Sequence, residues 1–442
     1  MGLSILSFCS RATGIKWLFY FYGLILNQQT VTQEHTRSGY FFLILILGSL
    51  TALAPFSIDM YLPSFPAIAK DFGVEQARVG LSLSSFFIGI SAGQLLYGPL
   101  LDRFGRKVPL ILGLLVYIAA SLGCVYAATL NSLVILRFIQ ALGSCAATVA
   151  SVAMVRDLFP VKENAKVFAL LMLVVGASPM LAPTIGGYAA AAFHWHAVFI
   201  VLGGIGLLLL LATIWWLPES YRPDTTLSLK PGPIIQSFWT VATTPQFYTY
   251  AFTGAIAFSG LFAYVSGSPQ VFMDAYHLDG KTYGWIFAGL SVGFIGCSQV
   301  NSFLLKRYES RQIVPVALTL QGIIAVVMAV SAWNDWLGLT SLLLLLFLFL
   351  CCMGFINPNT AALCLAPFTK NAGTASALMG ALQMGVGALA ATVVSLYNTH
   401  NAVPLALTMC GTSLLAAVVL FIGRRQIKTT VVAEKGSAVL SH

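Results

Sequence analysis

Apolar residues are arranged along this chain in twelve long runs that are separated by short polar segments. At about 1.5 Å per residue, an α-helix of about 20 residues crosses a hydrocarbon core of about 30 Å. The pattern therefore predicts twelve membrane-spanning helices, at residues 40–62, 77–99, 108–128, 131–155, 165–192, 197–217, 247–270, 282–305, 312–333, 337–358, 372–397 and 403–423.

The composition supports an all-α integral membrane protein. Hydrophobic residues make up 58% of the chain and charged residues only 8%, whereas soluble domains contain about 25% charged residues. The apolar runs have the length of helices, which argues against a β-barrel. The net charge of +9 does not indicate nucleic-acid binding, because the basic residues form short clusters between apolar runs. The expected surroundings are a lipid bilayer.

A polar connection divides the runs into two sets of six. This segment, Pro218 to Thr244, is the longest between any two runs and is rich in proline, which indicates a linker. We predict an N-terminal tail at 1–38, a first half at 39–217, a linker at 218–245, a second half at 246–424 and a C-terminal tail at 425–442. Residues 17–26 are apolar but too short to span a membrane, so the N-terminal segment is expected to be a tail.

The two halves repeat each other. When the sequence is shifted by 204 residues, 79–107 lies over 283–311, so that Gly80 meets Gly284 and Arg103 meets Arg307. The aligned helices then run in the same direction through the membrane. This is a parallel duplication of two six-helix halves, which is a transporter architecture.

The distribution of Lys and Arg predicts the orientation. With the N-terminus in the cytoplasm, 19 of the 23 basic residues fall on the cytoplasmic side and 3 on the outer side, and Arg137 lies within a run. Cytoplasmic loops carry the excess of basic residues, so both termini are predicted to be cytoplasmic.

The sequence contains no motif for a metal, a cofactor or an enzyme. The eight cysteines form no CxxC pair, and His194 and His196 have no third ligand nearby. No Walker loop, H-E-x-x-H or G-x-S-x-G motif occurs, which argues against an ATP-driven pump and a hydrolase.

Two charged residues, Asp59 and Arg137, lie inside apolar runs, where a charge is costly. Both lie about 6–9 Å below the outer interface at about 1.5 Å per residue. We expect them to form a pair that couples proton movement to transport, because burial favours the neutral carboxyl group and the guanidinium favours the carboxylate. The alternatives are a structural ion pair and an arginine that extends toward the outer surface.

The loop after the second run reads Gly98-Pro-Leu-Leu-Asp102-Arg103-Phe-Gly105-Arg106-Lys107. Gly98 is expected to allow close helix approach, Gly105 a tight reversal, and Asp102 to accept hydrogen bonds from a helix N-terminus or an arginine. The motif resembles the signature loop of the major facilitator superfamily, which implies a gating latch. The excess of basic residues that is usual in cytoplasmic loops is the alternative explanation, but it would account only for the basic residues of the motif. The second half has Lys306 where the first has Asp102, and so is expected to lack the latch.

Further motifs resemble the same superfamily. Arg137 and Gln140 match the R-x-x-Q-G motif, except that Ala141 replaces its glycine. The segment 178–187 is similar to the G-P-x-x-G-G motif of its antiporter branch, on the residues Pro179, Pro183, Gly186 and Gly187. Ser57 to Pro63 resembles the first helix of the subfamily of bicyclomycin and chloramphenicol exporters (Bcr/CflA), and Trp195-His196 fits it as well.

This resemblance implies a monomeric, proton-coupled exporter of amphipathic drugs in the bacterial inner membrane, with small molecules and protons as its partners. An importer of a small metabolite on the same fold is the alternative. The resembled fold places a further set of residues on the helices that line its cavity, although packing or lipid contact would also explain the aromatic ones: Tyr61, Gln140, Phe258, Phe262, Tyr264, Asn357 and Gln383.

Overall fold

The computed structural model describes residues 37–159, 161–221, 223, 231–368, 372–397 and 401–427. The tails at 1–36 and 428–442, and residues 222 and 224–230 of the expected linker, lie outside the described residues. Within the described part, twelve helices are long and apolar enough to cross a membrane. This confirms the prediction of an all-α protein with twelve spans.

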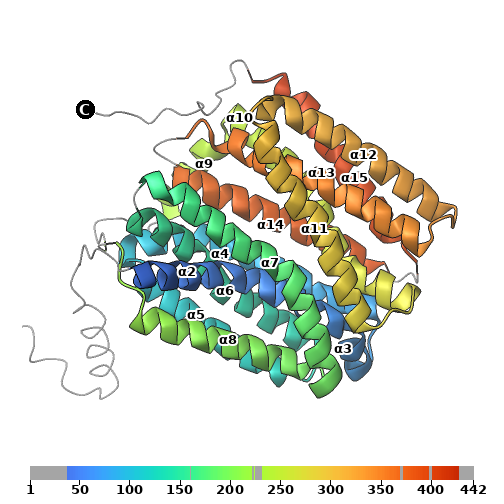
Figure 1. The fold of residues 1–442 in the computed structure, drawn as a ribbon, viewed down its shortest axis with the longest axis horizontal. Coiled ribbons are helices and arrows are strands. Elements are labelled where there is room, and N and C mark those ends of the chain that lie inside the picture. The colour runs from blue at the N-terminus through green and yellow to red at the C-terminus, as the bar shows by residue number, and fades with distance from the viewer. Residues whose placement is uncertain are drawn as a thin grey trace, which may run out of the picture.

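The helices form two groups that lie side by side (Figure 1). The first group contains α2 (Arg37–Asp59), the 3-10 turn η1 (Leu62–Ser64), α3 (Phe65–Phe72), α4 (Gln76–Phe104), α5 (Lys107–Val125), α6 (Leu130–Leu158), α7 (Val161–Phe193) and α8 (His196–Trp215). The second contains α10 (Pro245–Pro269), the π-helical turn η2 (Gln270–Ala275), α11 (Gly280–Leu304), α12 (Ser310–Trp333), α13 (Leu339–Leu365), α14 (Ala372–Leu396) and α15 (Val403–Arg424).

Two elements differ from the sequence prediction. The first run was expected to end at residue 62, but α2 ends at Asp59 and the chain continues through η1 into α3. Prolines at the first turns of η1 and α3 explain this, since proline suits a helix start and interrupts a helix interior. The expected linker also contains a helix, α9 (Pro231–Ala242), which the clustering of prolines concealed.

Small residues determine how closely the helices pack. Lipid is as apolar as leucine, so helices in a membrane associate by close packing and hydrogen bonds. Between α5 and α6, a Cβ atom added to Gly113 would lie 2.2 Å from the Cβ atom of Ala146, and one added to Gly143 would lie 2.6 Å from the Gly113 carbonyl oxygen. A larger side chain at either position would push these helices apart.

The two groups meet along a seam where α4 packs against α14 and α7 against α11. We call the end of the bundle that carries the Gly98–Lys107 loop the loop face, and the end that carries α3 the far face. At the far face, a Cβ atom on Gly80 would lie 2.2 Å from Ser395 Oγ, and one on Gly187 would lie 2.9 Å from the Gly280 carbonyl oxygen. The seam is therefore closed at the far face by close approach of the two halves at glycines.

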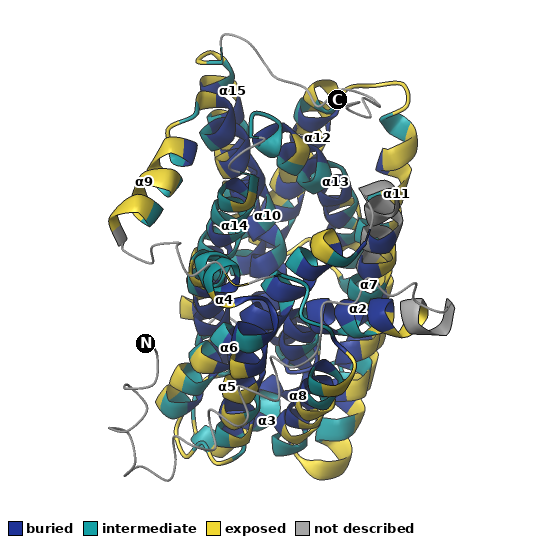
Figure 2. Cartoon of the chain, turned by 90° about the vertical axis from the view of Figure 1, so that its left-hand side faces the viewer, coloured by how far each residue is buried: buried dark blue, intermediate teal, exposed yellow. Residues whose placement is uncertain are grey.

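A cavity of about 770 Å³ opens at the loop face. Segments of α4, α6, α9 and α14 line it, and α9 lies beside the bundle when the molecule is viewed from this end (Figure 2). Its lining includes the charged residues Asp102, Arg106, Arg156 and Asp157. The structure is thus open between its halves at the loop face and closed at the far face.

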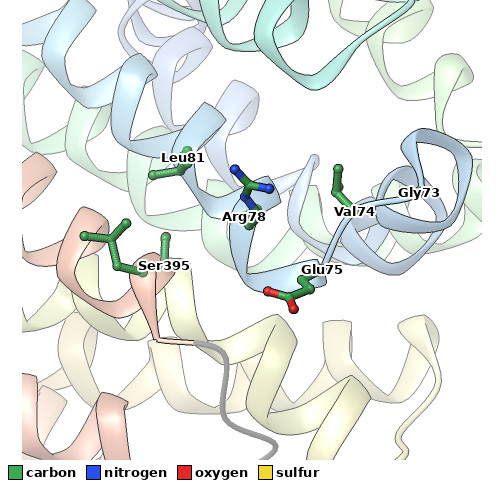
Figure 3. A pocket seen from close by; sticks show the side chains of 7 residues that line it. Gly73, Val74, Glu75, Arg78, Leu81 and Ser395 are labelled. Carbon is green, nitrogen blue, oxygen red and sulfur yellow. The ribbon is translucent and has the colours of Figure 1, made fainter.

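A pocket of about 460 Å³ lies at the far-face end of the α4–α14 contact (Figure 3). Arg78 and Leu396 line it from the two halves and are both exposed. If Arg78 and Leu396 are each replaced by cysteine, the extent of cross-linking between the two should therefore report on closure of the far face.

We expect Gly80→Val to open this contact, because the added side chain meets Ser395. Overpacking costs about 1–3 kcal/mol, which corresponds to a shift of roughly 5- to 150-fold away from the closed arrangement. In a background without other cysteines, cross-linking of R78C with L396C should fall accordingly. Gly204→Val is the control, since a Cβ atom there meets nothing within 4 Å. Equal cross-linking in both variants would contradict the conclusion that the contact at Gly80 closes the far face.

Candidate functional site

Arg137 is completely buried near the start of α6. Its Nη1 atom donates to Gln140 Oε1 at 2.7 Å, and its Nη2 atom donates to the Ser57 carbonyl oxygen at 3.0 Å. The Nε atom has no hydrogen-bond partner among the described residues. A buried cation needs further compensation.

Aromatic rings supply this compensation. The guanidinium carbon lies 4.2 Å from the ring centroid of Phe86 and 4.6 Å from that of Tyr61, and Phe199 is at 5.9 Å. A cation over an aromatic face gains about 2 kcal/mol or more when both groups are desolvated. These rings come from α4, from the turn after α2 and from α8, so the charge of Arg137 holds three elements around α6.

A chain of hydrogen bonds extends this centre. Gln140 Nε2 donates to Ser121 Oγ at 2.7 Å, and Ser121 Oγ donates to the Tyr117 carbonyl oxygen at 2.7 Å. The Tyr117 and Ser57 hydroxyl groups lie 2.7 Å apart. Arg137, Gln140 and these three residues therefore connect α2, α5 and α6 through groups that are all buried.

Asp59 is buried at the last residue of α2, but it does not form the expected ion pair with Arg137. Among the described residues, the ion pairs join Arg106 to Asp102 and to Asp157. Three residues after Asp59 begins η1, which contacts α10 and α11 across the seam.

The geometry of α2 explains this difference. Ser57 directs its hydroxyl group to Tyr117 on α5. Two residues along a helix correspond to a rotation of about 200°, so Asp59 faces away from α5. Depth in the membrane could be estimated from the sequence, whereas direction around the helix axis could not.

The remaining predicted cavity residues fall into two places. Tyr61 and Gln140 surround Arg137, and the Tyr61 hydroxyl lies 2.9 Å from Ser82 Oγ. Among the residues of the second half, Gln383 Nε2 donates to Asn357 Oδ1 at 2.8 Å.

The predicted aromatic residues lie on α10. Phe262 packs edge-on against Phe87 of the first half at 4.5 Å, and Phe258 is half-buried beside it at 5.4 Å. Tyr264 is buried and stacks on Phe287 at 5.4 Å. Packing thus accounts for Phe262, which also contacts Gly387 on α14.

The loop motif forms an ion-pair cluster. Arg106 Nη1 contacts Asp102 Oδ1 at 2.7 Å, and its Nε donates to Asp157 Oδ2 at 2.8 Å. Arg106 also lies 4.3 Å from the ring centroid of Tyr221. Burial disfavours the charged guanidinium, but the hydrogen bonds to Asp157 and Asp102 and their charges raise the pKa of Arg106 above its ordinary value. Asp102 therefore accepts from an arginine, one of the two expected partners.

Glu219 occupies the other expected position. Its carboxylate accepts from the backbone amides of Arg106 at 2.8 Å and Lys107 at 3.1 Å, at the N-terminus of α5 where a negative charge is favoured. Lys107 Nζ donates to the Ile214 carbonyl oxygen at 3.0 Å. Neither Glu219 nor Asp157 was predicted from the sequence, although acidic residues beside a basic cluster are a signal that could have identified them.

The glycines of the loop behave differently from each other. Gly105 has φ +81° and a Cβ atom there would lie 3.1 Å from Glu219 Oε2, which confirms the tight reversal. A Cβ atom on Gly98 would meet nothing within 4 Å. The expectation that Gly98 permits close helix approach is therefore wrong for this conformation, in which Gly98 lines the cavity at the loop face. Arg103 lies 5.8 Å from the Phe104 ring centroid.

The antiporter-like segment lies in α7, which continues through Pro179 and Pro183. A Cβ atom on Gly186 would lie 2.0 Å from the Met60 carbonyl oxygen. Gly186 therefore packs on the turn that follows Asp59, and Gly187 packs on α11 across the seam.

The chain is similar to known proteins over most of its length. The family model described as Major Facilitator Superfamily matches residues 47–392. A protein of Haemophilus influenzae named bicyclomycin resistance protein homolog is 33% identical over 384 residues, which cover 87% of this chain and 94% of that protein. The chloramphenicol resistance protein of Pseudomonas aeruginosa is 26% identical and covers 82% of this chain and 85% of its own length.

A solved structure shares the fold. It is a bacterial homolog of the human lysosomal transporter Spinster in an inward-facing and occupied conformation, with a TM-score of 0.73. It covers 91% of this chain and 100% of its own, at 14% identity.

The two acidic partners of Arg106 should contribute unequally to stability. The Asp157 side chain is 18% exposed and that of Asp102 is 50% exposed. We expect Asp102→Asn to lower the free energy of unfolding by about 1 kcal/mol or less, and Asp157→Asn by about 1–3 kcal/mol, because a hydrogen bond to a charged, more buried group is lost. Thermal unfolding of both purified variants checks the order. The reverse order would mean that Asp102 is the main anchor of the loop.

Proposed function

Because the chain belongs to the Major Facilitator Superfamily, a family of transporters and not of enzymes, we propose that it exports small amphipathic molecules in exchange for protons. The names of its relatives, which are bicyclomycin and chloramphenicol resistance proteins, support export. The observation that carries proton coupling is the buried carboxyl group of Asp59, which has no ion-pair partner among the described residues and lies three residues before η1, the turn that contacts α10 and α11.

The mechanism is alternating access. We place the loop face in the cytoplasm, because the sequence assigns 19 basic residues to that side and 3 to the other. The cavity of about 770 Å³ then faces the cytoplasm and the glycine contacts close the outer side. Rocking of the two halves about the seam would reverse this and expose Asp59 to the outside.

The substrate class follows from the chemistry of the walls. Besides its charged residues, the cavity is lined by apolar side chains such as Val149, Val152 and Met379 and by the amide group of Gln94. Such a site suits amphipathic molecules of modest size. A highly charged metabolite would need several convergent basic groups, whereas Arg137 is engaged by Ser57, Gln140 and the surrounding rings.

The loop cluster serves as a latch in this mechanism. Asp102 and the first residues of α14, Gly373 and Thr374, line the same cavity from opposite halves. Closing of the cavity would bring the carboxylate toward the N-terminus of α14, where a negative charge is favoured. The Asp102→Asn variant should therefore fold normally and transport slowly. Transport at the parent rate and at equal expression would show that the loop cluster does not act as a latch.

The proposed orientation predicts cytoplasmic termini. A reporter fused after Lys435 should have cytoplasmic activity, and one inserted between Asp274 and Lys281 should behave as external. An external signal from the C-terminal fusion would reverse the model.

Replacement of Asp59 tests the function directly. In cells and in proteoliposomes, the parent should export chloramphenicol or bicyclomycin against a gradient, and a proton uncoupler should stop it. Asp59→Asn keeps the shape and removes the titration, so uphill export should fall at least about tenfold while downhill exchange persists, since only the proton-driven step is lost.

Asp335→Asn is the matched control, because Asp335 is exposed in a turn at φ +55°, a conformation that Asn also tolerates. Proton-driven export by Asp59→Asn at the parent rate would refute Asp59 as the carrier. Uncoupler-sensitive accumulation inside cells would favour the importer.

A further inference from the structure

The cavity at the loop face has a charged rim and an uncharged floor. Its charged lining residues lie near the loop-face ends of α4 and α6 and at the start of α5. On α4, the lining residue farthest from that face is Gln94, and on α14 it is Gly380. At about 1.5 Å per residue, these two positions lie about 12–15 Å along their helices from the loop-face ends. They therefore mark the floor of the cavity.

A hydrogen bond between the two halves lies directly beyond this floor. Ser91 Oγ on α4 donates to the Ala381 carbonyl oxygen on α14 at 2.8 Å. Gln94 is about one helical turn nearer to the loop face than Ser91, and Gly380 precedes Ala381. A Cβ atom on Gly380 would lie 3.1 Å from Gln94 Cδ and 3.2 Å from its Oε1 atom. The amide group of Gln94 thus lies across the floor, in space that a side chain at residue 380 would occupy.

The amide group of Gln94 is available for a ligand. Gln94 is half-buried, and no hydrogen bond joins its side chain to another of the described residues. The amide groups that the sequence predicted to line the cavity have partners within the protein, since Gln140 binds two buried side chains and Gln383 binds Asn357. A side-chain amide without such a partner can both donate and accept hydrogen bonds.

We propose that Gln94 is a specificity-determining residue of this cavity, and that its amide group forms a hydrogen bond with an uncharged polar group of the substrate, such as a hydroxyl or an amide group. This inference rests on the proposed function, the export of small amphipathic molecules. The apolar part of the substrate would lie against Val149 of α6 and Met379 of α14, which also line the cavity near its floor.

The positions of the charges explain why the recognised group is uncharged. The charged lining residues belong to the rim, so an ionised group at the floor would lose its water without gaining an opposite charge. A molecule without any hydrogen-bonding group would instead leave the Gln94 amide without a partner, which is also costly. The floor therefore favours a neutral molecule that carries a hydroxyl or an amide group beside an apolar part.

The test is binding and export of chloramphenicol, which is uncharged and carries hydroxyl and amide groups. Gln94→Met keeps the length of the side chain and removes its hydrogen bonds. Loss of one net hydrogen bond should weaken equilibrium binding to the purified protein about 2- to 12-fold. In proteoliposomes, KM should rise by the same factor while kcat stays unchanged, as expected when binding is lost equally in the ground state and the transition state. Gln94→Leu is a second apolar variant and should behave alike.

Gln236→Met is the matched control, because Gln236 is exposed on α9 and does not line the cavity. Its binding of chloramphenicol should stay within about twofold of the parent, which is the usual range for a surface substitution. The thermal unfolding midpoints of all three variants should stay within about 2 °C of the parent, since no hydrogen bond within the protein is lost.

The outcomes separate this inference from the proposed function. Parent-like binding in both Gln94 variants would overturn the role of Gln94 while the parent still exports the drug. A fall in kcat with unchanged KM, or loss of folding in both variants, would show that Gln94 acts on helix packing and would overturn it too. If the parent itself neither binds nor exports chloramphenicol, the proposed function fails and the role of Gln94 falls with it.

Discussion

A charged group inside an apolar helix bundle must be compensated, and the compensation of Arg137 organises the first half of this protein. Its donors bind a backbone carbonyl at the end of α2 and a glutamine on its own helix, and its flat face is surrounded by rings from three elements. The cation therefore needs no carboxylate in direct contact. Asp59 is thus left without an ion-pair partner among the described residues.

The internal duplication also shapes the seam. Gly80 and Gly284 occupy equivalent positions in the repeat, and each lies at a contact between the halves: Gly80 against Ser395 of α14 and Gly284 against Thr184 of α7. Two related contacts close the far face on either side of the point where α2 ends. A pseudo-twofold arrangement of this kind allows both contacts to break together when the halves move.

The two ends of the seam are built from different interactions. The far face closes by close contacts at glycines, and such contacts contribute little stability unless the fit is close. The loop face carries charges that are satisfied within the first half, through Arg106 with Asp102 and Asp157 and through Glu219 at the start of α5. Charges that are already paired within one half hold the loop in place without joining it to the other half, and this is compatible with an open cavity.

The sequence by itself determined the features that depend on position along a helix. Bilayer thickness sets the length of each apolar run. Because a charged side chain inside a membrane span is costly, Asp59 and Arg137 are recognisable as unusual at any position in a run. The match between the two halves and the sharp turn at Gly105 follow from the same local rules.

Only the tertiary structure decided which neighbour each side chain meets. The separation of Asp59 from Arg137, the cap that Glu219 provides and the open surroundings of Gly98 all depend on how each helix is rotated about its axis. That rotation is fixed by packing against segments that are distant in the sequence, as Ser57 packs against Tyr117 and Arg106 against Glu219, and in a uniformly apolar helix no local pattern records it.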